Sequence, residues 1–420
     1  MRFSIVNLGC KVNRVESDAV AAQLIGGGAE ESPLHAADLI VVNTCTVTGE
    51  AEKKTRKAVR HALRANGAAR VLVTGCAAAL RPEVFEGMSP RVACVPKAAL
   101  GEAVSREAAS LEPQGPLPHD GRAGLLRIGG AFPTRVGVKV QDGCDNACTY
   151  CIVHIARGRA VSRDADGIVR ECAAYARAGV KEIVLTGINL GSYRNTAPDG
   201  SRYGLADLLR ALLEATADSR GHGGPACRFR ISSIEPRDVD DGLIALLAEA
   251  GGRICRHLHL PLQAGSSKVL REMARPYDAP FFLDLVARLR AAVPSLSLST
   301  DIIAGFPGET DGEFAETLEV ARACAFSKIH AFPYSMREGT HAAARGDQVP
   351  PAVKEERAGR LRALGEKLRR EDFARRIGTR ELVLVEQSGR GMTESYHEVA
   401  APAEAPIGAL VELPIAAPLP

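Results

Sequence analysis

The first 100 residues alternate between short apolar runs and longer amphipathic segments. Three runs, FSIVNLG (3–9), DLIVVNTC (38–45) and RVLVTGC (70–76), predict strands buried on both faces. The segments 14–28 and 50–67 between them have helical spacing, and both end at glycine. This β-α-β-α-β order predicts a parallel sheet covered by helices.

The same alternation returns on a larger scale between residues 132 and 345. Six apolar runs predict strands there, each separated from the next by a helix-like stretch. The runs are 134–143, 182–189, 228–235, 257–263, 295–305 and 328–335. Six such β/α units predict a partial (β/α)6 barrel.

The remaining segments divide the chain. Residues 101–130 are rich in proline and glycine and predict a linker, and residues 351–376 predict a charged helix. The tail reads as short strands with Gly, Ser and Pro turns, which predicts a small β-barrel. We therefore expect an α/β protein with an N-terminal sheet domain (1–120), a barrel (130–350), a linking helix (351–376) and a C-terminal barrel (377–420).

Composition limits the function classes. The 420 residues are 46% hydrophobic and 25% charged with a net charge of +3, so any basic surface for nucleic acid must be local. The start, MRFSIVNLGC, lacks a basic stretch followed by an apolar run, and no apolar stretch is long enough to span a bilayer. Eleven cysteines are too few for a secreted disulfide scaffold. We expect a cytoplasmic protein without a membrane partner.

Three cysteines form a C-x3-C-x2-C pattern directly after the first predicted barrel strand. They are Cys144, Cys148 and Cys151. Three thiolates on a four-iron cube leave one iron open, which is how a metal site takes part in chemistry. The alternative is a zinc loop with a fourth ligand elsewhere, for example His154.

A second set of three cysteines lies in the first domain. Cys10, Cys45 and Cys76 each follow the carboxyl end of a predicted strand. Parallel strands gather those ends at one edge, where ligands bind, so the three thiols are expected to converge. A single such cysteine would usually be a core residue, but three at one topological position indicate a second metal cluster.

The C-x3-C-x2-C loop after the first strand of six β/α units resembles the radical S-adenosylmethionine (SAM) superfamily. That resemblance implies a 4Fe–4S cluster whose open iron is filled by the amino and carboxylate groups of SAM. In that superfamily an electron from the cluster splits SAM into methionine and a 5′-deoxyadenosyl radical.

The whole layout resembles the radical SAM methylthiotransferase family, with its sheet domain, radical SAM barrel and small TRAM-like barrel. The motifs that carry this are CIVHIARGRAVSR, LTGINLGSY, RISSIEP, HLHLPLQAGSSKVLREMARPY, DIIAGFPGET and HAFPYSMREGT. The resemblance implies two 4Fe–4S clusters, with sulfur held on Cys10, Cys45 and Cys76 and a second SAM supplying the methyl group.

The family has three substrate branches. They modify isopentenyladenosine 37 of tRNA, N6-threonylcarbamoyladenosine 37 of tRNA (t6A37), or an aspartate of a ribosomal protein. The motifs LGCKVN, NTCTVT and HAFPYS resemble the threonylcarbamoyladenosine branch. The partners implied are the anticodon loop of tRNA and an electron donor, and we expect a monomer. A different class, an iron–sulfur RNA-binding protein without turnover, would lack SAM cleavage.

The resemblance also implies SAM contacts. Thr186 and Gly187 end the second barrel strand, where glycine permits close backbone approach to the SAM amino group. The other expected contacts are Tyr150, Ser232, Glu235 and Gln263. Ser232, Glu235 and Gln263 could each equally be a solvated loop residue at a strand end.

The expected RNA surfaces follow from charge. The tail from 381 to 420 holds six glutamates and only Arg390 as a basic residue, so it offers few phosphate contacts. Basic residues are denser on the predicted helices at 50–67 and 351–376. We expect those faces, with Arg157 and Arg159, to provide most of the electrostatic affinity, although a solvated helix face is the default reading.

Overall fold

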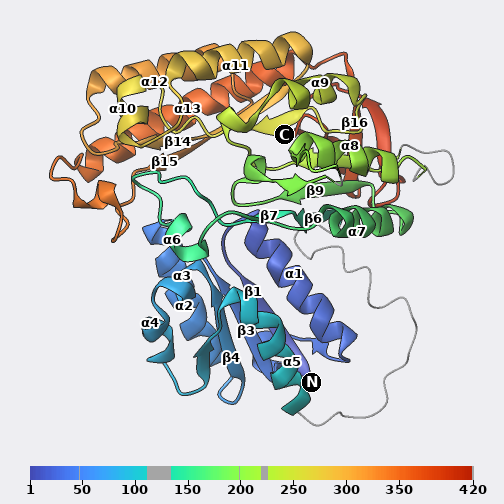
Figure 1. The fold of residues 1–420 in the computed structure, drawn as a ribbon, viewed down its shortest axis with the longest axis vertical. Coiled ribbons are helices and arrows are strands. Elements are labelled where there is room, and N and C mark those ends of the chain that lie inside the picture. Colours follow the sequence, from blue (N-terminus) through green and yellow to red (C-terminus); the bar gives the residue numbers. More distant parts are fainter. Residues whose placement is uncertain (47, 111–133, 198, 219–225, 419–420) are drawn as a thin grey trace. The chain divides into compact units, whose positions relative to one another are not determined.

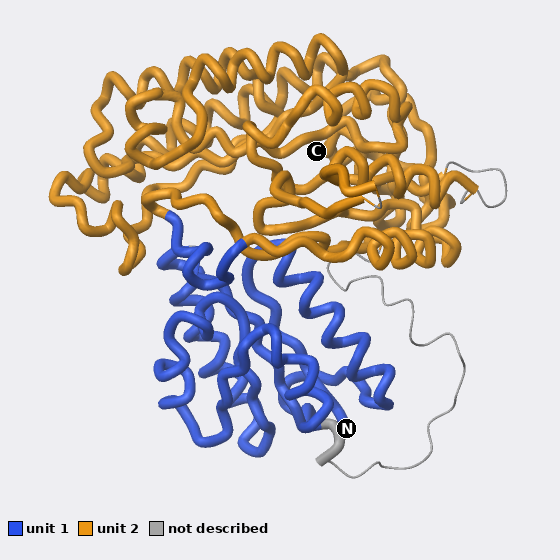
Figure 2. Tube along the Cα trace, viewed as in Figure 1, with its two compact units in different colours: residues 1–130, 151–159 blue, residues 131–150, 160–420 orange. Residues whose placement is uncertain are grey.

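The computed structural model describes residues 1–46, 48–110, 134–197, 199–218 and 226–418. The chain forms two compact units, shown in Figure 2. Unit 1 comprises residues 1–130 with 151–159, and unit 2 comprises residues 131–150 with 160–420. The fold class is α/β, as the sequence predicts.

Unit 1 is a five-stranded parallel sheet in the order β2-β1-β3-β4-β5, with helices packed against it (Figure 1). Its strands are β1 (Arg2–Asn7), β2 (Glu30–Glu31), β3 (Leu39–Thr44), β4 (Arg70–Gly75) and β5 (Val92–Cys94). Its helices are α1 (Lys11–Gly26), α2 (Gly49–Ala65), α3 (Cys76–Leu80), α4 (Pro82–Glu86), α5 (Leu100–Ser110) and α6 (Val153–Arg157). The three apolar runs predicted as strands are β1, β3 and β4.

The central strand β3 explains why its sequence is almost entirely apolar. Ile40 and Val42 belong to the core on one side of the sheet, whereas Leu39 and Val41 belong to the core on the other side. Successive strand residues point to opposite faces, so a strand covered on both faces needs apolar residues at every position.

The predicted linker begins later than expected. Residues 101–110 belong to helix α5 (Leu100–Ser110), because the apolar residues of the segment LGEAVSREAAS recur with helical spacing. Residues 111–130 of the predicted linker lie outside the described residues.

Unit 2 contains all six predicted barrel strands in chain order. They form two three-stranded parallel sheets, β12-β9-β6 and β13-β14-β15. Parallel bridges Phe229↔Ile254 and Ser233↔His259 connect them. The strands are β6 (Arg135–Lys139), β9 (Glu182–Thr186), β12 (Arg228–Ile231), β13 (His257–His259), β14 (Ser297–Ala304) and β15 (Lys328–Pro333).

Helices cover these strands. They are α7 (Ala165–Arg177), α8 (Leu205–Ala215), α9 (Asp241–Glu249), α10 (Ser267–Glu272), α11 (Ala279–Ala292) and α12 (Asp311–Cys324). Two antiparallel pairs are minor additions, β7 (Gln141–Asp142) with β8 (Val161–Ser162) and β10 (Asn195–Thr196) with β11 (Arg202–Tyr203).

The C-terminal part is a long helix followed by an antiparallel sheet. Helix α13 (Pro351–Ala374) packs on β14 and β15. The sheet has the order β18-β17-β16-β19, with β16 (Arg380–Gln387), β17 (Arg390–Thr393), β18 (Glu398–Ala400) and β19 (Leu410–Pro414). The sequence predicts the helix and the short strands of this region, and the proposed domain boundaries stay a prediction.

A network of buried ion pairs and hydrogen bonds connects the C-terminal sheet to β12. Glu182 is fully buried and accepts hydrogen bonds from Arg228 (2.7 Å) and Arg230 (2.8 Å). The same two guanidinium groups donate to carbonyl oxygens of the C-terminal sheet, Arg228 to Leu382 at 2.7 Å and Arg230 to Thr393 at 3.1 Å. The pKa of Glu182 is lowered because the nearby arginines outweigh the effect of burial.

Within the described residues, no helix combines the length and the apolarity that crossing a bilayer requires.

Candidate active site

The three N-terminal cysteines follow neighbouring strands of the unit 1 sheet. In register, Asn7 of β1 pairs with Asn43 of β3, and Asn43 pairs with Thr74 of β4. The cysteines follow within two or three residues of these positions, at Cys10, Cys45 and Cys76. Cys10 is at the N-cap position of α1 without a side-chain capping hydrogen bond, and Cys76 is the first residue of α3. The strand order therefore places all three cysteines at the carboxyl-end edge of one sheet, and their role as cluster ligands stays a prediction.

Two glycines with positive φ let these loops approach one another. A Cβ atom on Gly9 (φ +106°) would lie 2.6 Å from Cβ of Cys45. A Cβ atom on Gly75 (φ +97°) would lie 2.4 Å from the carbonyl oxygen of Thr44. Both positions therefore require glycine, for conformation and for space. Each glycine directly precedes a cysteine of the set, so close packing of the loops brings the thiols to one edge.

A polar cluster surrounds this edge and reaches the sulfur atoms. The side-chain amide of Asn13 donates to the carbonyl oxygens of Leu8 and Thr44, both at 2.8 Å. Arg157 of α6 donates to Sγ of Cys76 at 3.3 Å and to Oδ1 of Asn13 at 2.6 Å.

Arg157 is a buried cation rather than a phosphate ligand. Its side chain is 1% exposed and forms an ion pair with Glu16 at 3.1 Å. The sequence-based expectation that Arg157 contributes to an RNA surface is therefore wrong. A guanidinium at a thiol sulfur stabilises negative charge there, as on a thiolate or an anionic cluster. The sequence showed a basic residue after the cysteine loop but not its partners.

A single metal ion does not fit the N-terminal cysteines as they stand. Among the described residues, the three sulfur atoms do not all lie within 4.8 Å of one another, and no cysteine belongs to a group of that closeness. The assignment of a four-iron cluster to these cysteines therefore stays a prediction.

Arg275 organises the loop that carries the C-x3-C-x2-C cysteines. Its side chain is 2% exposed and donates to Sγ of Cys148 at 3.2 Å and to the hydroxyl of Tyr150 at 3.5 Å. It also forms an ion pair with Glu235. Three residues predicted separately, Cys148, Tyr150 and Glu235, thus meet around one guanidinium group. Arg275 lies in the quoted motif ARPY, but spacing alone did not identify its role.

Burial raises the pKa of the Cys144 thiol and outweighs the opposing hydrogen bond from the backbone N–H of Asn146. The neighbouring Cys148 and Glu235 also raise this pKa, whereas Arg275 lowers it. Cys151 Sγ accepts a hydrogen bond from the backbone N–H of Val153 at 3.4 Å.

Gly187 lies where a side chain would collide with Gln141. A Cβ atom on Gly187 would be 2.9 Å from Oε1 of Gln141. That oxygen accepts from the N–H of Asn189 at 2.9 Å, while Nε2 of Gln141 donates to the carbonyl of Gly143 at 2.8 Å. Gln141 therefore ties the start of the cysteine loop to the end of β9, where Thr186 is buried.

Ser232 and Gln263 have features typical of ligand contacts. Ser232 is 3% exposed, and its hydroxyl oxygen finds no hydrogen-bond partner in the described part of the chain. A buried hydroxyl without a partner is costly, so a ligand oxygen or nitrogen would satisfy it. Gln263 has φ +64°, a conformation that non-glycine residues adopt rarely and mostly at functional sites.

The basic helices differ in how their charges are placed. On α2, Lys53, Lys54, Lys57 and Arg60 are exposed. On α13, Arg357 is buried and paired with Glu309 at 2.8 Å, so its expected place on an RNA surface is wrong. Other α13 cations form ion pairs within the helix, Arg360 with Glu356, Arg362 with Glu355 and Lys367 with Glu371.

Two of the six tail glutamates are buried in salt bridges. Glu381 pairs with Arg376 at 3.0 Å, and Glu394 pairs with Arg256 at 2.6 Å. The tail is therefore less acidic at its surface than its sequence indicates.

Comparisons with known proteins identify the family of the chain. Residues 138–321 match the radical SAM superfamily, and residues 2–96 match an uncharacterized protein family, UPF0004. Among solved structures, a radical SAM methyltransferase, TsrM from Kitasatospora setae, shares the fold with a TM-score of 0.57 at 15% identity. That likeness covers 81% of this chain and 77% of the other. The fold and the cysteine loop thus define a radical SAM protein.

Relatives of higher identity narrow the class. The chain is 39% identical to threonylcarbamoyladenosine tRNA methylthiotransferase MtaB of Bacillus subtilis, over 87% of this chain and 80% of the relative. It is 36% identical to the protein of the same name from Thermotoga maritima, over 94% and 89%. It is also 36% identical to tRNA-2-methylthio-N(6)-dimethylallyladenosine synthase of Bacillus subtilis, over 86% and 72%.

The chain belongs to the tRNA methylthiotransferase family of radical SAM enzymes. It is an enzyme of this kind, and SAM and two 4Fe–4S clusters are the cofactors of the family. The resemblance drawn from the cysteine patterns is thereby confirmed.

Proposed function

We propose that this enzyme methylthiolates N6-threonylcarbamoyladenosine at position 37 of tRNAs. The observation that carries the proposal is the similarity to relatives named for threonylcarbamoyladenosine, at 39% and 36% identity over most of the chain. Similarity to a dimethylallyladenosine synthase at 36% makes isopentenyladenosine 37 the competing substrate. The motifs LGCKVN, NTCTVT and HAFPYS favour the first.

We assign the cofactors to two sets of residues. Cys144, Cys148 and Cys151 would hold the cluster that binds SAM, and Cys10, Cys45 and Cys76 would hold the second cluster. When bound, the first cluster and SAM supply a 5′-deoxyadenosyl radical, and the second cluster supplies sulfur. The orphan hydroxyl of Ser232 supports a ligand there, and the buried Arg157 beside Cys76 supports an anionic group at the second set.

The protein's own residues position and shield the reaction. Arg275 fixes Cys148, Tyr150 and Glu235 relative to one another, which preorganises the proposed SAM side before ligand binds. Gly187 and Gln141 hold the cysteine loop against the end of β9. Thr186, Glu235 and Gln263 complete the proposed SAM contacts.

The proposed partners are the tRNA anticodon loop and a separate electron donor. The exposed lysines and arginines of α2 supply a cationic face for phosphates. None of the eleven cysteines forms a disulfide in the part of the chain that the structure describes, which fits a reducing cytoplasm, and we expect a monomer.

The test is a reconstituted reaction. Full-length protein loaded anaerobically with iron and sulfide receives SAM, dithionite and anticodon stem-loops carrying either t6A or isopentenyladenosine. The proposal expects 5′-deoxyadenosine, methionine and a methylthio product on the t6A stem-loop. Product only on the isopentenyladenosine stem-loop would reassign the substrate. Formation of 5′-deoxyadenosine without a methylthio product on either stem-loop would reject both substrates.

A further inference from the structure

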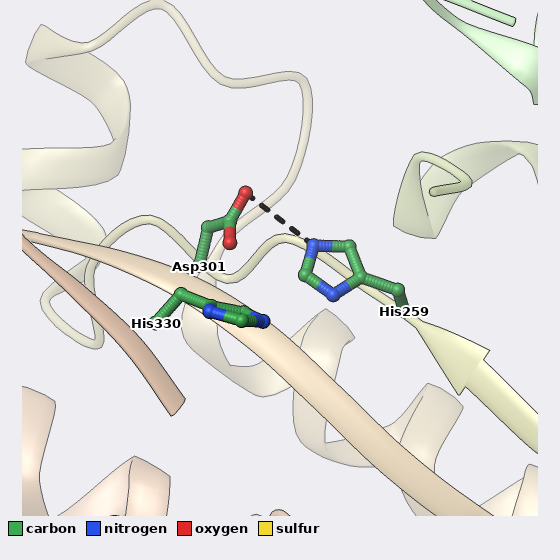
Figure 3. A group of neighbouring side chains, drawn as sticks. All are labelled: His259, Asp301 and His330. Atoms are coloured by element: carbon green, nitrogen blue, oxygen red, sulfur yellow. Dashed lines mark ion pairs between the residues drawn. The ribbon is translucent and has the colours of Figure 1, made fainter. Parts of the chain in front are cut away.

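Three polar side chains gather on adjacent strands of unit 2, as Figure 3 shows. They are His259 at the end of β13, Asp301 in β14 and His330 in β15, and we call them the His–Asp–His trio. Asp301 and His330 are partners in register, and one nitrogen or oxygen atom from each of the three lies within 4.8 Å of the others.

The trio is held in place by its own contacts. Nε2 of His259 lies 3.3 Å from Oδ2 of Asp301, and Nδ1 of His259 lies 3.0 Å from Oγ of Ser299. The His259 and His330 rings are tilted, with centroids 5.8 Å apart. All three trio residues are only partly buried, so they are accessible to a ligand.

The strand pattern shows which face the trio occupies. Ile329 packs against α13, since a Cβ atom on Gly365 of that helix would lie 3.2 Å from Cβ of Ile329. Neighbouring strand residues point to opposite faces, so His330 and Phe332 point away from α13. Phe332 is 40% exposed. This face therefore carries a polar trio and, one strand repeat away, an exposed aromatic ring.

The trio adjoins the residues proposed to contact SAM. The carbonyl of His259 accepts a hydrogen bond at 3.1 Å from Ile234, which lies between Ser232 and Glu235. The carbonyl of Asp301 accepts one at 2.9 Å from the N–H of Gln263. A substrate that reacts beside SAM would meet this face.

We propose that the His–Asp–His trio binds the threonylcarbamoyl group of the substrate nucleoside, with Phe332 available to stack on its base. This inference rests on the proposed function and names the residues that would select the substrate. The threonylcarbamoyl group has a carboxylate, a hydroxyl and ureido N–H groups. His259 and His330 can donate to the carboxylate, and Asp301 can accept from an N–H or the hydroxyl.

The same chemistry explains rejection of the apolar alternative. An isopentenyl group offers no hydrogen-bonding atom, so its burial against the trio would shield three polar side chains from water and give them no new hydrogen bond. Sites built to bond a polar substrate group discriminate strongly against analogues that lack it. Two histidines and a carboxylate also form a ligand set for a divalent cation. The exposed ring on the same face and the adjoining SAM-side residues favour the nucleoside.

The test is a cycle of protein and substrate changes in the reconstituted reaction. The protein variants are His330→Ala, Asp301→Asn and, as a matched control, His35→Ala, whose side chain is exposed in unit 1. The stem-loops carry t6A or its carboxamide, which lacks the carboxylate charge. Methylthio product, KM for RNA and 5′-deoxyadenosine are measured together. Zinc and cobalt binding are measured on the same proteins.

We expect His330→Ala to raise KM for the t6A stem-loop by roughly tenfold or more, the factor that accompanies removal of a hydrogen bond to a charged group. The carboxamide should weaken binding by a similar factor with the wild-type protein and little further with His330→Ala. The rate of SAM cleavage by His330→Ala should stay within about twofold of the wild-type rate. All the measured quantities for the His35→Ala control should also stay within about twofold of wild type.

Three results would overturn the inference. The first is that the carboxamide and His330→Ala raise the KM for RNA independently, so that their effects multiply when they are combined. The second is that the trio variants no longer cleave SAM. The third is that the wild-type protein binds one zinc or cobalt ion tightly and that Asp301→Asn abolishes this binding. Wild-type protein that ignores t6A altogether would instead reject the proposed function, so the two failures are distinguishable.

Discussion

Replacing Arg157 by alanine should lower the reduction potential of the cluster proposed on Cys10, Cys45 and Cys76. The guanidinium donates to Sγ of Cys76 at 3.3 Å, and its side chain is almost completely buried. Reduction adds negative charge to a cluster, and a fixed neighbouring cation favours that charge. Removal of the cation therefore makes reduction harder.

The size of the expected decrease in reduction potential follows from the distance between the guanidinium and the sulfur and from the shielding of this charge. A unit charge at 3.3 Å from a sulfur interacts by about 5 kcal/mol at an effective dielectric constant of about 20. For a one-electron couple this corresponds to about 200 mV as an upper bound. Glu16 lies 3.1 Å from the same guanidinium and offsets part of its field. We therefore expect a decrease of roughly 50–100 mV.

The assay is a redox titration followed by electron paramagnetic resonance. All proteins carry Cys144, Cys148 and Cys151 replaced by alanine, so that only the N-terminal cluster contributes a signal. Arg159→Ala is the matched control, because Arg159 is exposed and lies two residues from Arg157. Equal potentials for Arg157→Ala and Arg159→Ala, with equal iron content, would refute the reasoning.

Three further predictions concern stability, the SAM side and RNA. Glu182→Gln leaves buried arginines without their carboxylate and should lower the free energy of unfolding by about 3–5 kcal/mol; denaturant unfolding measures this, and a decrease below about 1 kcal/mol would contradict it. Because the pKa of folded Glu182 is lowered, its stabilisation is complete above the unfolded value near pH 4.3 and declines only as the pH falls further. Gly187→Ala should displace Gln141 and reduce 5′-deoxyadenosine formation roughly tenfold relative to Gly346→Ala, whose Cβ atom would meet no neighbour and whose φ is not positive; equal rates would exclude this role. Replacing the exposed lysines of α2 by glutamine should weaken the salt dependence of tRNA binding. The slope of log K against log salt concentration should fall by about one for each phosphate that is no longer neutralised. Replacing Arg360 and Arg362, which form ion pairs within α13, should change this slope less. The reverse ranking would move the RNA surface to α13.

The sequence was sufficient for the parts of the fold that depend on local pattern. Buried strands such as β3 are continuous apolar runs, and the cysteines follow strand ends, so chain order and topology together placed Cys10, Cys45 and Cys76 at one edge. Long-range polar pairing has no such local pattern. Arg275 binds Cys148, which is 127 residues away, and Arg157 binds Cys76, which is 81 residues away.

The charge pattern of the helices and the tail was misleading for the same reason. Arg357 and Glu394 look like surface charges in the sequence but pair with residues from other elements and are buried. The His–Asp–His trio could not be predicted because its members come from three strands. Each residue alone reads as an ordinary polar position, and only the register of β13, β14 and β15 brings them together.

Mass spectrometry of tRNA nucleosides from cells with and without this protein tests the proposed substrate. In cells without the protein, we predict that 2-methylthio-N6-threonylcarbamoyladenosine disappears, that N6-threonylcarbamoyladenosine accumulates in its place, and that methylthiolated isopentenyladenosine is unchanged. Restoring the wild-type chain should restore the product, whereas a chain with Cys144, Cys148 and Cys151 replaced should not. An unchanged level of 2-methylthio-N6-threonylcarbamoyladenosine in cells without the protein would contradict the account.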